Sequence, residues 1–365
     1  MIADFLKEWL ETGDFITVEH LDLAPVAADV LSGEPLSILS DRSAVVFFRD
    51  KGDSLWAIKK VFADGAFQAE HSRAIKSLIP HHPGFEAGYM RRVLDAGAVS
   101  AAALRDSPLP AWIHNSILMP AAAGVDWSTF RSDVQHGRQY LPVNQRLALV
   151  RSLSQEIQWL EGQDISHRDL SGGNVLVDAA NGQVHLVDWE GMFRAELPAP
   201  GCLRRGTYGY IAPFVAGKGV SDGRFTWRAR ADRFALAVIC AEILCVSAEF
   251  PATSDDGFCG QDELYVRSGP CLSAMTEILE RTFFRAALLL KRALAADDFD
   301  DCPSPADWAA SVGSESKRRR RPIPQRDRAT FASLNRFGFT PLNKSLFVRL
   351  KRHQFAQPPY RIRLL

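Results

Sequence analysis

The sequence predicts an α+β protein with two lobes, a small one rich in strands with one main helix and a larger one that is mostly helical. Three observations carry this prediction: β-branched and aromatic runs separated by turns between residues 36 and 61, a long amphipathic stretch at 143–163, and helical periodicity from residue 229 onward. With 365 residues and 47% hydrophobic content, the chain can bury a core of that size.

The small lobe is expected to follow a short amphipathic helix at residues 1–12. Strand signals begin near residue 36 with LSIL, AVVFFR and SLWAIKKVF, and the turn DKGD separates the last two. A helix is predicted at 66–79, where apolar residues recur every three or four positions. Two further strands are predicted at 88–99 and 111–121. We therefore expect an N-terminal extension at 1–30 and the small lobe at 31–122.

The large lobe begins after the turn GVDW. Its first helix, at 143–163, carries an apolar stripe. Two short runs, NVLVD and VHLVDW, flank the turn AANGQ and predict a hairpin. The last helix signal is SPADWAASV, and the run SKRRRRP then marks a boundary. The predicted large lobe is 123–313, and a basic C-terminal tail occupies 314–365.

The tail concentrates positive charge in a chain whose net charge is zero. Residues 317–365 hold 14 Lys and Arg against one acid, Asp327, so the preceding residues carry the balancing excess of acids. Aromatic side chains are interleaved with these cations, a combination that suits an acidic protein partner or nucleic acid. Packing on the acidic body or simple solvation explains the same composition. The sequence leaves these alternatives open.

The sequence also bears on location. The N-terminus lacks the basic start and long apolar run of a signal peptide, and the longest apolar stretch, FALAVICAEILCV, is too short to span a bilayer. Six cysteines form no CxxC pair and no zinc-like spacing, which favours buried reduced thiols. We expect a cytoplasmic protein with no membrane span.

Four polar residues are placed where phosphoryl transfer needs them. That reaction requires a group that orients or deprotonates the acceptor, oxygen ligands for Mg²⁺, and a cation on the nucleotide phosphates. Lys59 lies within an apolar strand, Asp169 and Asn174 flank a turn, and Asp188 ends the strand VHLVD. A lysine inside such a strand is costly unless it is paired.

Five stretches in this order carry a family resemblance: WAIKK, HRDLSGGNVLVD, LVDWEG, GTYGYIAPF and ADRFALAVICAEIL. Through them the chain resembles the protein kinase superfamily, and specifically the bacterial kinases of eukaryotic type. The stretches span most of residues 36–312. Any one of them could occur by chance, whereas five in the right order with similar gaps are specific. The resemblance implies the bilobal kinase fold.

The resemblance also implies roles for single residues. Lys59 would reach the α- and β-phosphates of ATP, and Glu70 on the following helix would hold it by an ion pair. Asp169 would be the catalytic base, and Asn174 and Asp188 would bind Mg²⁺. Supporting positions are implied for His167, Arg168, Thr207 and Asp232. The nucleotide would contact Lys59 together with Ser40, Arg42, Ser43, Val46, Met119 and Ala121.

Four departures from the family pattern concern the nucleotide loop, the metal motif, the acceptor side and a buried pair. No glycine lies between Gly33 and Gly52, so the phosphate loop would depend on Ser40, Arg42 and Ser43 instead. The triplet Asp188-Trp189-Glu190 is similar to that of aminoglycoside and choline phosphotransferases. Ser171 replaces a lysine that touches the γ-phosphate, and Phe214 with Cys302 replaces a glutamate–arginine pair.

The leading hypothesis is an ATP- and Mg²⁺-dependent protein kinase that acts on Ser or Thr of a protein substrate. The segment GTYGYIAP supports it, because it resembles a platform for protein substrates. A non-catalytic pseudokinase scaffold and a small-molecule kinase of the aminoglycoside or choline type are the alternatives. The absent glycines favour the scaffold and the DWE triplet favours the small-molecule enzyme.

Overall fold

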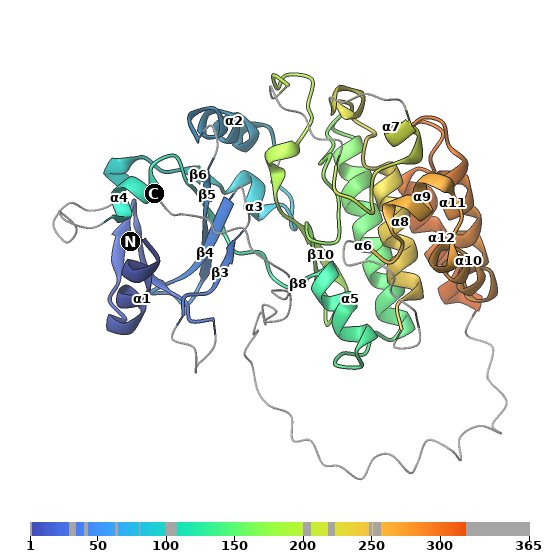
Figure 1. The fold of residues 1–365 in the computed structure, drawn as a ribbon, viewed down its shortest axis with the longest axis horizontal. Helices are drawn as coiled ribbons and strands as arrows, with labels where there is room; N and C mark the ends of the chain where they lie inside the picture. The colour runs from blue at the N-terminus through green and yellow to red at the C-terminus, as the bar shows by residue number, and fades with distance from the viewer. Residues whose placement is uncertain are drawn as a thin grey trace, which may run out of the picture.

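A small lobe containing a curled sheet stands beside a larger helical lobe in the computed structural model (Figure 1). The structure describes residues 2–28, 34–39, 43–62, 65–79, 81–98, 108–199, 206–217, 223–247, 250 and 257–318. The predicted α+β class and its two lobes are confirmed. The basic tail beyond residue 318 lies outside the described residues, and the division into four segments stays a prediction.

The small lobe is built on one antiparallel sheet whose strands run in the order β1-β2-β4-β5-β7-β6, with β3 on β4. The bounds are β1 (Ile16–Val18), β2 (Leu21–Pro25), β3 (Ser37–Leu39), β4 (Ser43–Asp50), β5 (Leu55–Val61), β6 (Arg92–Val93) and β7 (Ile117–Pro120). The expectation that strands begin near residue 36 is wrong, because β2 pairs with β4 between Leu23 and Asp50. The short run LDLAP alternates between the two faces of the sheet and was too brief to be recognised.

Five short elements accompany this sheet: α1 (Ile2–Thr12), α2 (Gly65–Leu78), α3 (Glu86–Tyr89), the 3₁₀ turn η1 (Ala96–Ala98) and α4 (Leu109–Ile113). Helices occupy 86–89 and 109–113, where strands were predicted to begin. Only short parts of the predicted strands are extended, namely β6 within 88–99 and β7 at the end of 111–121. Apolar runs of this length fit a buried helix as well as a strand, and tertiary packing decides between them.

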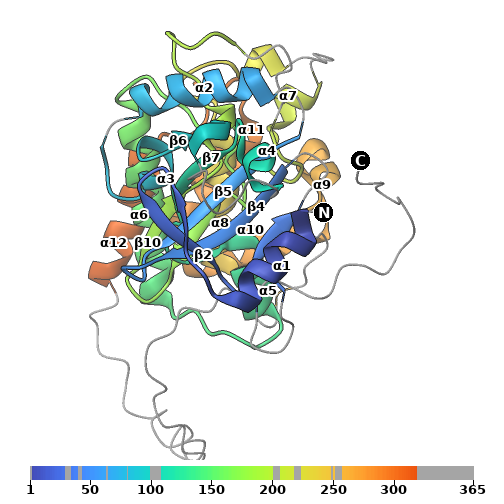
Figure 2. The same ribbon diagram turned by 90° about the vertical axis from the view of Figure 1, so that its left-hand side faces the viewer.

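The two faces of the sheet have different neighbours. On one face Leu6 and Trp9 of α1 pack against Phe48 and Ile58, and Figure 2 shows α1 lying across the strands. The other face carries Ala57 and Met119, which pack toward Ala87 and Val187 at the large lobe. This second face therefore forms the small-lobe side of the junction between the lobes.

The large lobe joins a small sheet to a helical bundle. Its strands β8 (Val125–Asp126), β9 (Val175–Asp178) and β10 (Gln183–Leu186) pair in the order β10-β9-β8. The helices are α5 (Trp127–Gln135), α6 (Val143–Glu161), α7 (Pro213–Gly217), α8 (Arg233–Cys245), α9 (Gln261–Val266), α10 (Pro270–Thr282), α11 (Phe284–Ala295) and α12 (Pro305–Arg318), with 3₁₀ turns η2 (Trp189–Gly191) and η3 (Gly223–Thr226). The predicted hairpin and the long helix are confirmed.

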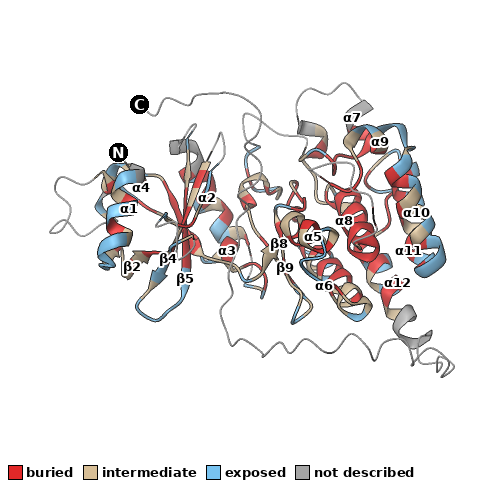
Figure 3. Ribbon diagram, turned by 60° about the horizontal axis from the view of Figure 1, so that its bottom comes forward, coloured by how far each residue is buried: buried red, intermediate tan, exposed pale blue. Residues whose placement is uncertain are grey.

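Helix α8 is the centre of this lobe and is buried along its length (Figure 3). Its apolar sequence fits that position, but Glu242 is fully buried within it. The carboxylate accepts hydrogen bonds from Trp127 Nε1 at 2.7 Å and from the backbone N–H of Phe258 at 2.9 Å. Tyr210 donates its hydroxyl to the same group at 3.3 Å. These donors compensate the cost of burying the charge.

Two expectations about location and cysteine chemistry can be compared with the described residues. None of the helices in the described ranges is long and apolar enough to cross a membrane. Cys240, Cys245, Cys259, Cys271 and Cys302 are free and buried, as expected for reduced thiols, while Cys202 lies outside the described residues.

Candidate active site

The loop between α6 and β9 is held by a buried carboxylate at the start of α8. Asp232, 2% exposed, accepts hydrogen bonds from the backbone N–H groups of His167 at 2.6 Å and Arg168 at 2.7 Å. Burial raises the pKa of Asp232, although the two N–H groups favour its charged form. The imidazole Nε2 of His167 lies 2.8 Å from the carbonyl of Val187, which ties the loop to the strand that precedes Asp188.

Arg168 holds this loop against the segment that follows the metal motif. Its guanidinium donates to the carbonyls of Thr226 and Gly191, both at 2.8 Å, and to the hydroxyl of Thr226 at 2.7 Å, and it lies over the ring of Trp227. Burial lowers the pKa of Arg168 to about 10. Its backbone φ is 64°, a left-handed conformation that a residue with a side chain adopts only when its surroundings impose it.

Asp169 projects from this loop with one carboxylate oxygen engaged by the segment GTYGYIAP. Thr207 donates its hydroxyl to Oδ1 of Asp169 at 2.7 Å. Asn174 donates its amide N–H to the backbone carbonyl of Asp169 at 2.8 Å, so the side-chain carbonyl oxygen of Asn174 is left as an acceptor. The structure thus brings Asp169, Asn174 and Thr207 together from sequence positions 38 residues apart at most.

Lys59 reaches across from β5 to the metal motif. Its ammonium lies 2.6 Å from Oδ1 of Asp188 and 3.0 Å from Oε2 of Glu190. Asp188 adopts a left-handed backbone with φ 65°, which starts the turn η2 and places Glu190 on the same side as the carboxylate before it. Val187 donates its N–H to the carbonyl of Asn174 at 3.1 Å, so Asn174 and Asp188 stand at adjacent strand ends.

The three charged groups perturb one another. Burial alone would lower the pKa of Lys59, but the carboxylates of Asp188 and Glu190 raise it above its ordinary value. Although the side chain of Asp188 is 42% exposed, partial loss of water around its carboxylate and the charge of Glu190 raise its pKa, despite the adjacent ammonium. For Glu190, Lys59 and Arg91 outweigh burial and lower the pKa. Groups whose pKa values are perturbed by burial together with specific charged partners cluster at functional sites.

The prediction that Glu70 forms an ion pair with Lys59 is wrong, because Lys59 contacts Asp188 and Glu190 instead. Glu70 is exposed on α2, whereas its neighbours His71 and Ser72 are buried. Because successive helix residues are turned by about 100°, burying His71 and Ser72 leaves Glu70 on the solvent side. The partner of Lys59 is Glu190, a residue of the metal motif itself.

Glu190 is in turn connected to α2 and to Arg91, the residue just before β6. His71 Nε2 lies 3.2 Å from the backbone carbonyl of Glu190, and Nη1 of Arg91 lies 3.4 Å from its carboxylate Oε1. Arg91 is 1% exposed and also donates to the carbonyl of Ala87. The glutamate is therefore fixed from two sides before it contacts Lys59.

The expected nucleotide contacts need one correction. Val45 and not Val46 lies directly opposite Lys59 in the β4–β5 register, so Val46 points to the other face of the sheet. Val46 packs in the cluster of Trp9 and Phe48, away from the large lobe. The error arose because a one-residue shift exchanges the two faces of a strand.

The remaining nucleotide positions are only partly described. Met119 is buried beside Ala57 on the face that looks toward Val187, and Ser43 begins β4. Ala121 donates its backbone N–H to the carbonyl of Leu55. Ser40 and Arg42 lie outside the described residues.

The comparison with family models bears directly on this site. Residues 98–259, which contain Asp169, Asn174, Asp188, Thr207 and Asp232, match the model of the protein tyrosine and serine/threonine kinases. Residues 98–259 therefore match a protein kinase domain. The kinase resemblance drawn from the sequence motifs is confirmed, and with it the enzyme class of protein kinase.

Solved structures also resemble the kinase domain. A crystal structure of the Mycobacterium tuberculosis PknI kinase domain is 19% identical, with a TM-score of 0.47, and the match covers 80% of this chain and 100% of that one. A second crystal structure of the same kinase domain is 19% identical, with a TM-score of 0.48 and coverage of 84% and 98%. No curated protein matches the sequence.

Sequence reasoning missed four residues of the kinase site: Val45, His71, Arg91 and Glu190. The role of Glu190 had a visible signal in the sequence, because an acid two residues after the expected metal ligand, Asp188, is close enough to share Lys59 with it. His71 and Arg91 gave none, since their contacts with Glu190 join positions 119 and 99 residues apart. Residue type alone does not reveal such long-range partners.

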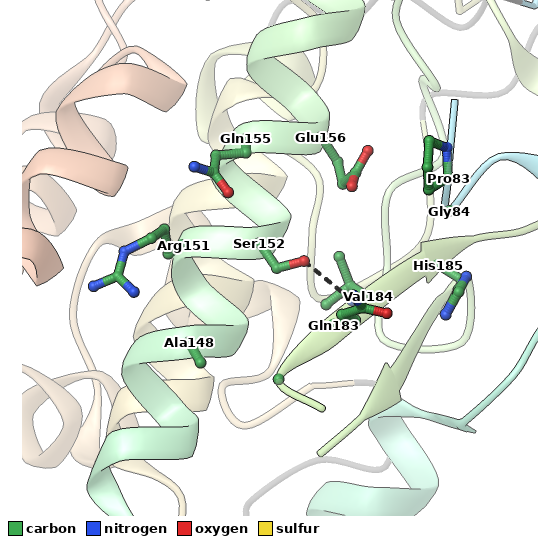
Figure 4. Close-up of a pocket in the computed structure, with 11 residues that line it drawn as sticks. Pro83, Gly84, Ala148, Arg151, Ser152, Gln155, Glu156, Gln183, Val184 and His185 are labelled. Carbon is green, nitrogen blue, oxygen red and sulfur yellow. Dashed lines mark hydrogen bonds between the residues drawn. The ribbon is translucent and has the colours of Figure 1, made fainter. Parts of the chain in front are cut away.

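A cavity of about 320 Å³ lies away from these residues, between α6 and β10 of the kinase domain (Figure 4). Glu156 extends from α6 toward Pro83 and Gly84, and its Oε2 lies 3.1 Å from Nδ1 of His82. Burial, aided by the charge of Glu86, raises the pKa of Glu156 to about 8. None of the predicted catalytic positions lines this cavity.

Proposed function

We propose that this protein is an ATP- and Mg²⁺-dependent protein kinase that transfers the γ-phosphate to Ser or Thr hydroxyls of a protein substrate. The observation that carries the proposal is the convergence of Lys59, Asp169, Asn174 and Asp188 from β5, the α6–β9 loop and the end of β10. A scaffold without catalysis has no need to keep all four together with left-handed strain at Asp188.

The donor set suits a hard divalent cation. No hydrogen bond to the amide oxygen of Asn174 is formed among the described residues, and the side chain of Asp188 is 42% exposed, so both can serve as oxygen ligands of Mg²⁺. When bound, Mg²⁺ neutralises charge on the transferred phosphoryl group. Lys59 would hold the α- and β-phosphates. Its present contact with Asp188 shows that an ammonium already stabilises the charge of this carboxylate.

Asp169 would accept the proton of the substrate hydroxyl. Thr207 occupies only Oδ1, which leaves Oδ2 for the acceptor, and it fixes the rotation of the carboxylate. The loop that carries Asp169 is anchored through Asp232 and Arg168, so the base is positioned before substrate arrives. The hydrogen bond from Thr207 supports the Ser/Thr class, because the resemblance gives that residue to Ser/Thr kinases.

Ser171 and Gly172 shape the acceptor side. Ser171 is buried, in place of the expected lysine, and a side chain at Gly172 would collide with the hydroxyls of Ser128 and Tyr210. Tyr210 belongs to the segment GTYGYIAP, so this segment packs directly on the catalytic loop. That packing favours a protein acceptor over a small molecule. The five described cysteines form no disulfide, which is typical of cytoplasmic proteins.

The deciding experiment is a transfer assay with labelled ATP and Mg²⁺. The purified full chain is incubated alone, with a generic protein substrate, and with an aminoglycoside or choline. We expect label on phosphoserine or phosphothreonine of protein, abolished in Asp188→Ala and retained in Asp262→Ala, an exposed acid on α9. Transfer only to the small molecules would contradict the protein-kinase assignment, and ATP binding without any transfer would indicate a pseudokinase.

A further inference from the structure

A basic cavity of about 540 Å³ lies on the small lobe, between α2, β6 and the turn from β1 to β2. Figure 2 shows α2 passing over β6 on this side of the molecule. Four cationic side chains line the cavity, Arg73, Lys76, Arg91 and Arg92, against a single carboxylate, that of Glu19. Of the residues described at the catalytic site, only Arg91 is among those that line it.

Two buried polar atoms at this cavity lack partners. Ser72 is 0% exposed and its Oγ makes no hydrogen bond, and Arg91 is 1% exposed and its Nη2 makes none, among the residues that the structure describes. An unsatisfied buried donor costs roughly 1–3 kcal/mol, and more for a charged group. Two such donors beside one cavity indicate a site built for an acceptor-rich ligand.

The rim of the cavity adds exposed charge of the same sign. Arg73 and Lys76, three residues apart on α2, are exposed and form no ion pair within the described part of the chain. Arg92 is paired with Glu19 at 3.3 Å, so the only acid of the lining is already neutralised. The lining therefore offers hydroxyl, guanidinium and ammonium donors with no competing anion.

We propose that this cavity is a binding site for a phosphate group. A phosphate dianion has the acceptor oxygens that Ser72 and Arg91 lack, and two guanidinium groups with an ammonium are the cations that recognise it. The group could belong to a phosphorylated side chain of a protein segment or to a small phosphorylated metabolite. The chemistry of recognition is shared, and the experiment separates the two sources.

The site is physically connected to Lys59. Arg91 uses Nη1 for Glu190 at 3.4 Å, Glu190 holds Lys59 at 3.0 Å, and the second nitrogen of Arg91, Nη2, has no partner among the described residues. An anion on Arg91 changes the charge that Glu190 experiences. Binding of the phosphate group and binding of nucleotide are then coupled, and each changes the affinity of the other by the same factor. This coupling rests on the proposed function, whereas the binding site itself does not.

The binding test measures the affinity of the full chain for inorganic phosphate by calorimetric titration. A titration with chloride at matched ionic strength is the reference. We expect saturable binding that weakens at least tenfold in Arg73→Gln/Lys76→Gln and a few-fold in Ser72→Ala. The matched control Arg281→Gln/Arg285→Gln removes two exposed arginines of α10 and α11 and should bind as the parent chain does. Equal binding by Arg73→Gln/Lys76→Gln overturns the proposal.

A second variant excludes binding at the nucleotide site. Lys59→Met should retain the phosphate affinity, and loss of binding in that variant would overturn the proposal. Because no phosphoryl transfer is measured, failure here is distinct from failure of the proposed kinase activity. Tighter binding of a phosphoserine peptide than of both phosphate and the serine peptide identifies a protein segment as the source. Equal affinity for phosphate and phosphopeptide identifies a small metabolite.

The coupling is tested with a non-hydrolysable ATP analogue. Saturating phosphate should shift the dissociation constant of the analogue in the parent chain and not in Arg73→Gln/Lys76→Gln. The absence of any shift in the parent chain would overturn the connection through Arg91 and Glu190.

Discussion

The catalytic loop at 167–174 and the region around Lys59 are held in different ways. In the loop each predicted residue makes a contact within the large lobe: Asp232 caps two backbone N–H groups, and Thr207 holds Asp169. Around Lys59 the predicted partner Glu70 is replaced by Glu190. The comparison teaches that the position of the loop depends on hydrogen bonds to its backbone from within one lobe. The position of Lys59 depends instead on an ion pair between side chains of the two lobes, and an acid on either lobe could serve as its partner.

The largest effect is expected at the loop. Asp169→Asn should lower kcat by about 10²–10⁴-fold, because the amide cannot accept the proton of the substrate hydroxyl. The side chain keeps an oxygen for Thr207, so nucleotide binding should be unchanged when it is measured with a fluorescent nucleotide. A kcat within tenfold of the parent enzyme would mean that Asp169 is not the base.

The next largest effect is expected when Asp232, the residue that anchors the loop, is replaced. Asp232→Ala leaves the N–H groups of His167 and Arg168 buried without acceptors, which should cost about 2–5 kcal/mol of unfolding free energy. Urea denaturation measures it. The matched variant Asp300→Ala removes an exposed partner of Arg230 and should cost about 1 kcal/mol or less. Equal losses in the two variants would contradict the anchoring role.

The Lys59 region is tested by comparing two glutamates. Glu190→Gln removes a charged partner of Lys59, an interaction worth about 1.5–3 kcal/mol, so kcat/KM for ATP should fall about 10–100-fold. Glu70→Gln should change it less than about twofold, since that side chain is exposed. Steady-state kinetics with varied ATP distinguishes them. The reverse order would show that Glu70 rotates inward in the working enzyme.

The smallest effect concerns Glu156, which lies where the segment after α2 contacts the large lobe. Its pKa is raised to about 8, so the folded protein keeps a proton that the unfolded chain releases near its ordinary pKa. The folded state binds more protons between these values, and raising the pH through that window lowers stability. As the pH is raised through this window, we expect the unfolding temperature of the parent chain to fall by about 2–4 °C, and that of Glu156→Gln to fall less. An equal fall of the unfolding temperature with pH in the parent chain and in Glu156→Gln would contradict this role of Glu156.

The parts that sequence reasoning recovered are those with local signals. The hairpin β9–β10 and helix α6 have clear periodicity, and the kinase motifs give Asp169, Asn174 and Asp188 by spacing alone. Strands β1 and β2 were missed because three to five residues provide too little pattern. Val46 was placed on the wrong face because only pairing with β5 sets the register.

The sequence also predicted in part how an ion pair of the kinase family is replaced in this chain by two buried apolar residues. Phe214 and Cys302 both lie in the core of the large lobe, as expected for two apolar groups in place of a charged pair. The ring of Phe214 packs edge-on against Phe299, with centroids 4.9 Å apart. That aromatic contact was not predicted, because it joins α7 to the loop before α12, which lies more than 80 residues further along the chain.

By itself the sequence determined the two-lobed class, the kinase motifs and the residue types available for phosphoryl transfer, because these follow from periodicity and spacing along the chain. Only the tertiary structure decided which glutamate holds Lys59. The rotation of α2 buries His71 and exposes Glu70, and the left-handed turn at Asp188 directs Glu190 to the lysine. Both depend on how the lobes pack, and an acid opposite a buried ammonium is chosen by proximity in space.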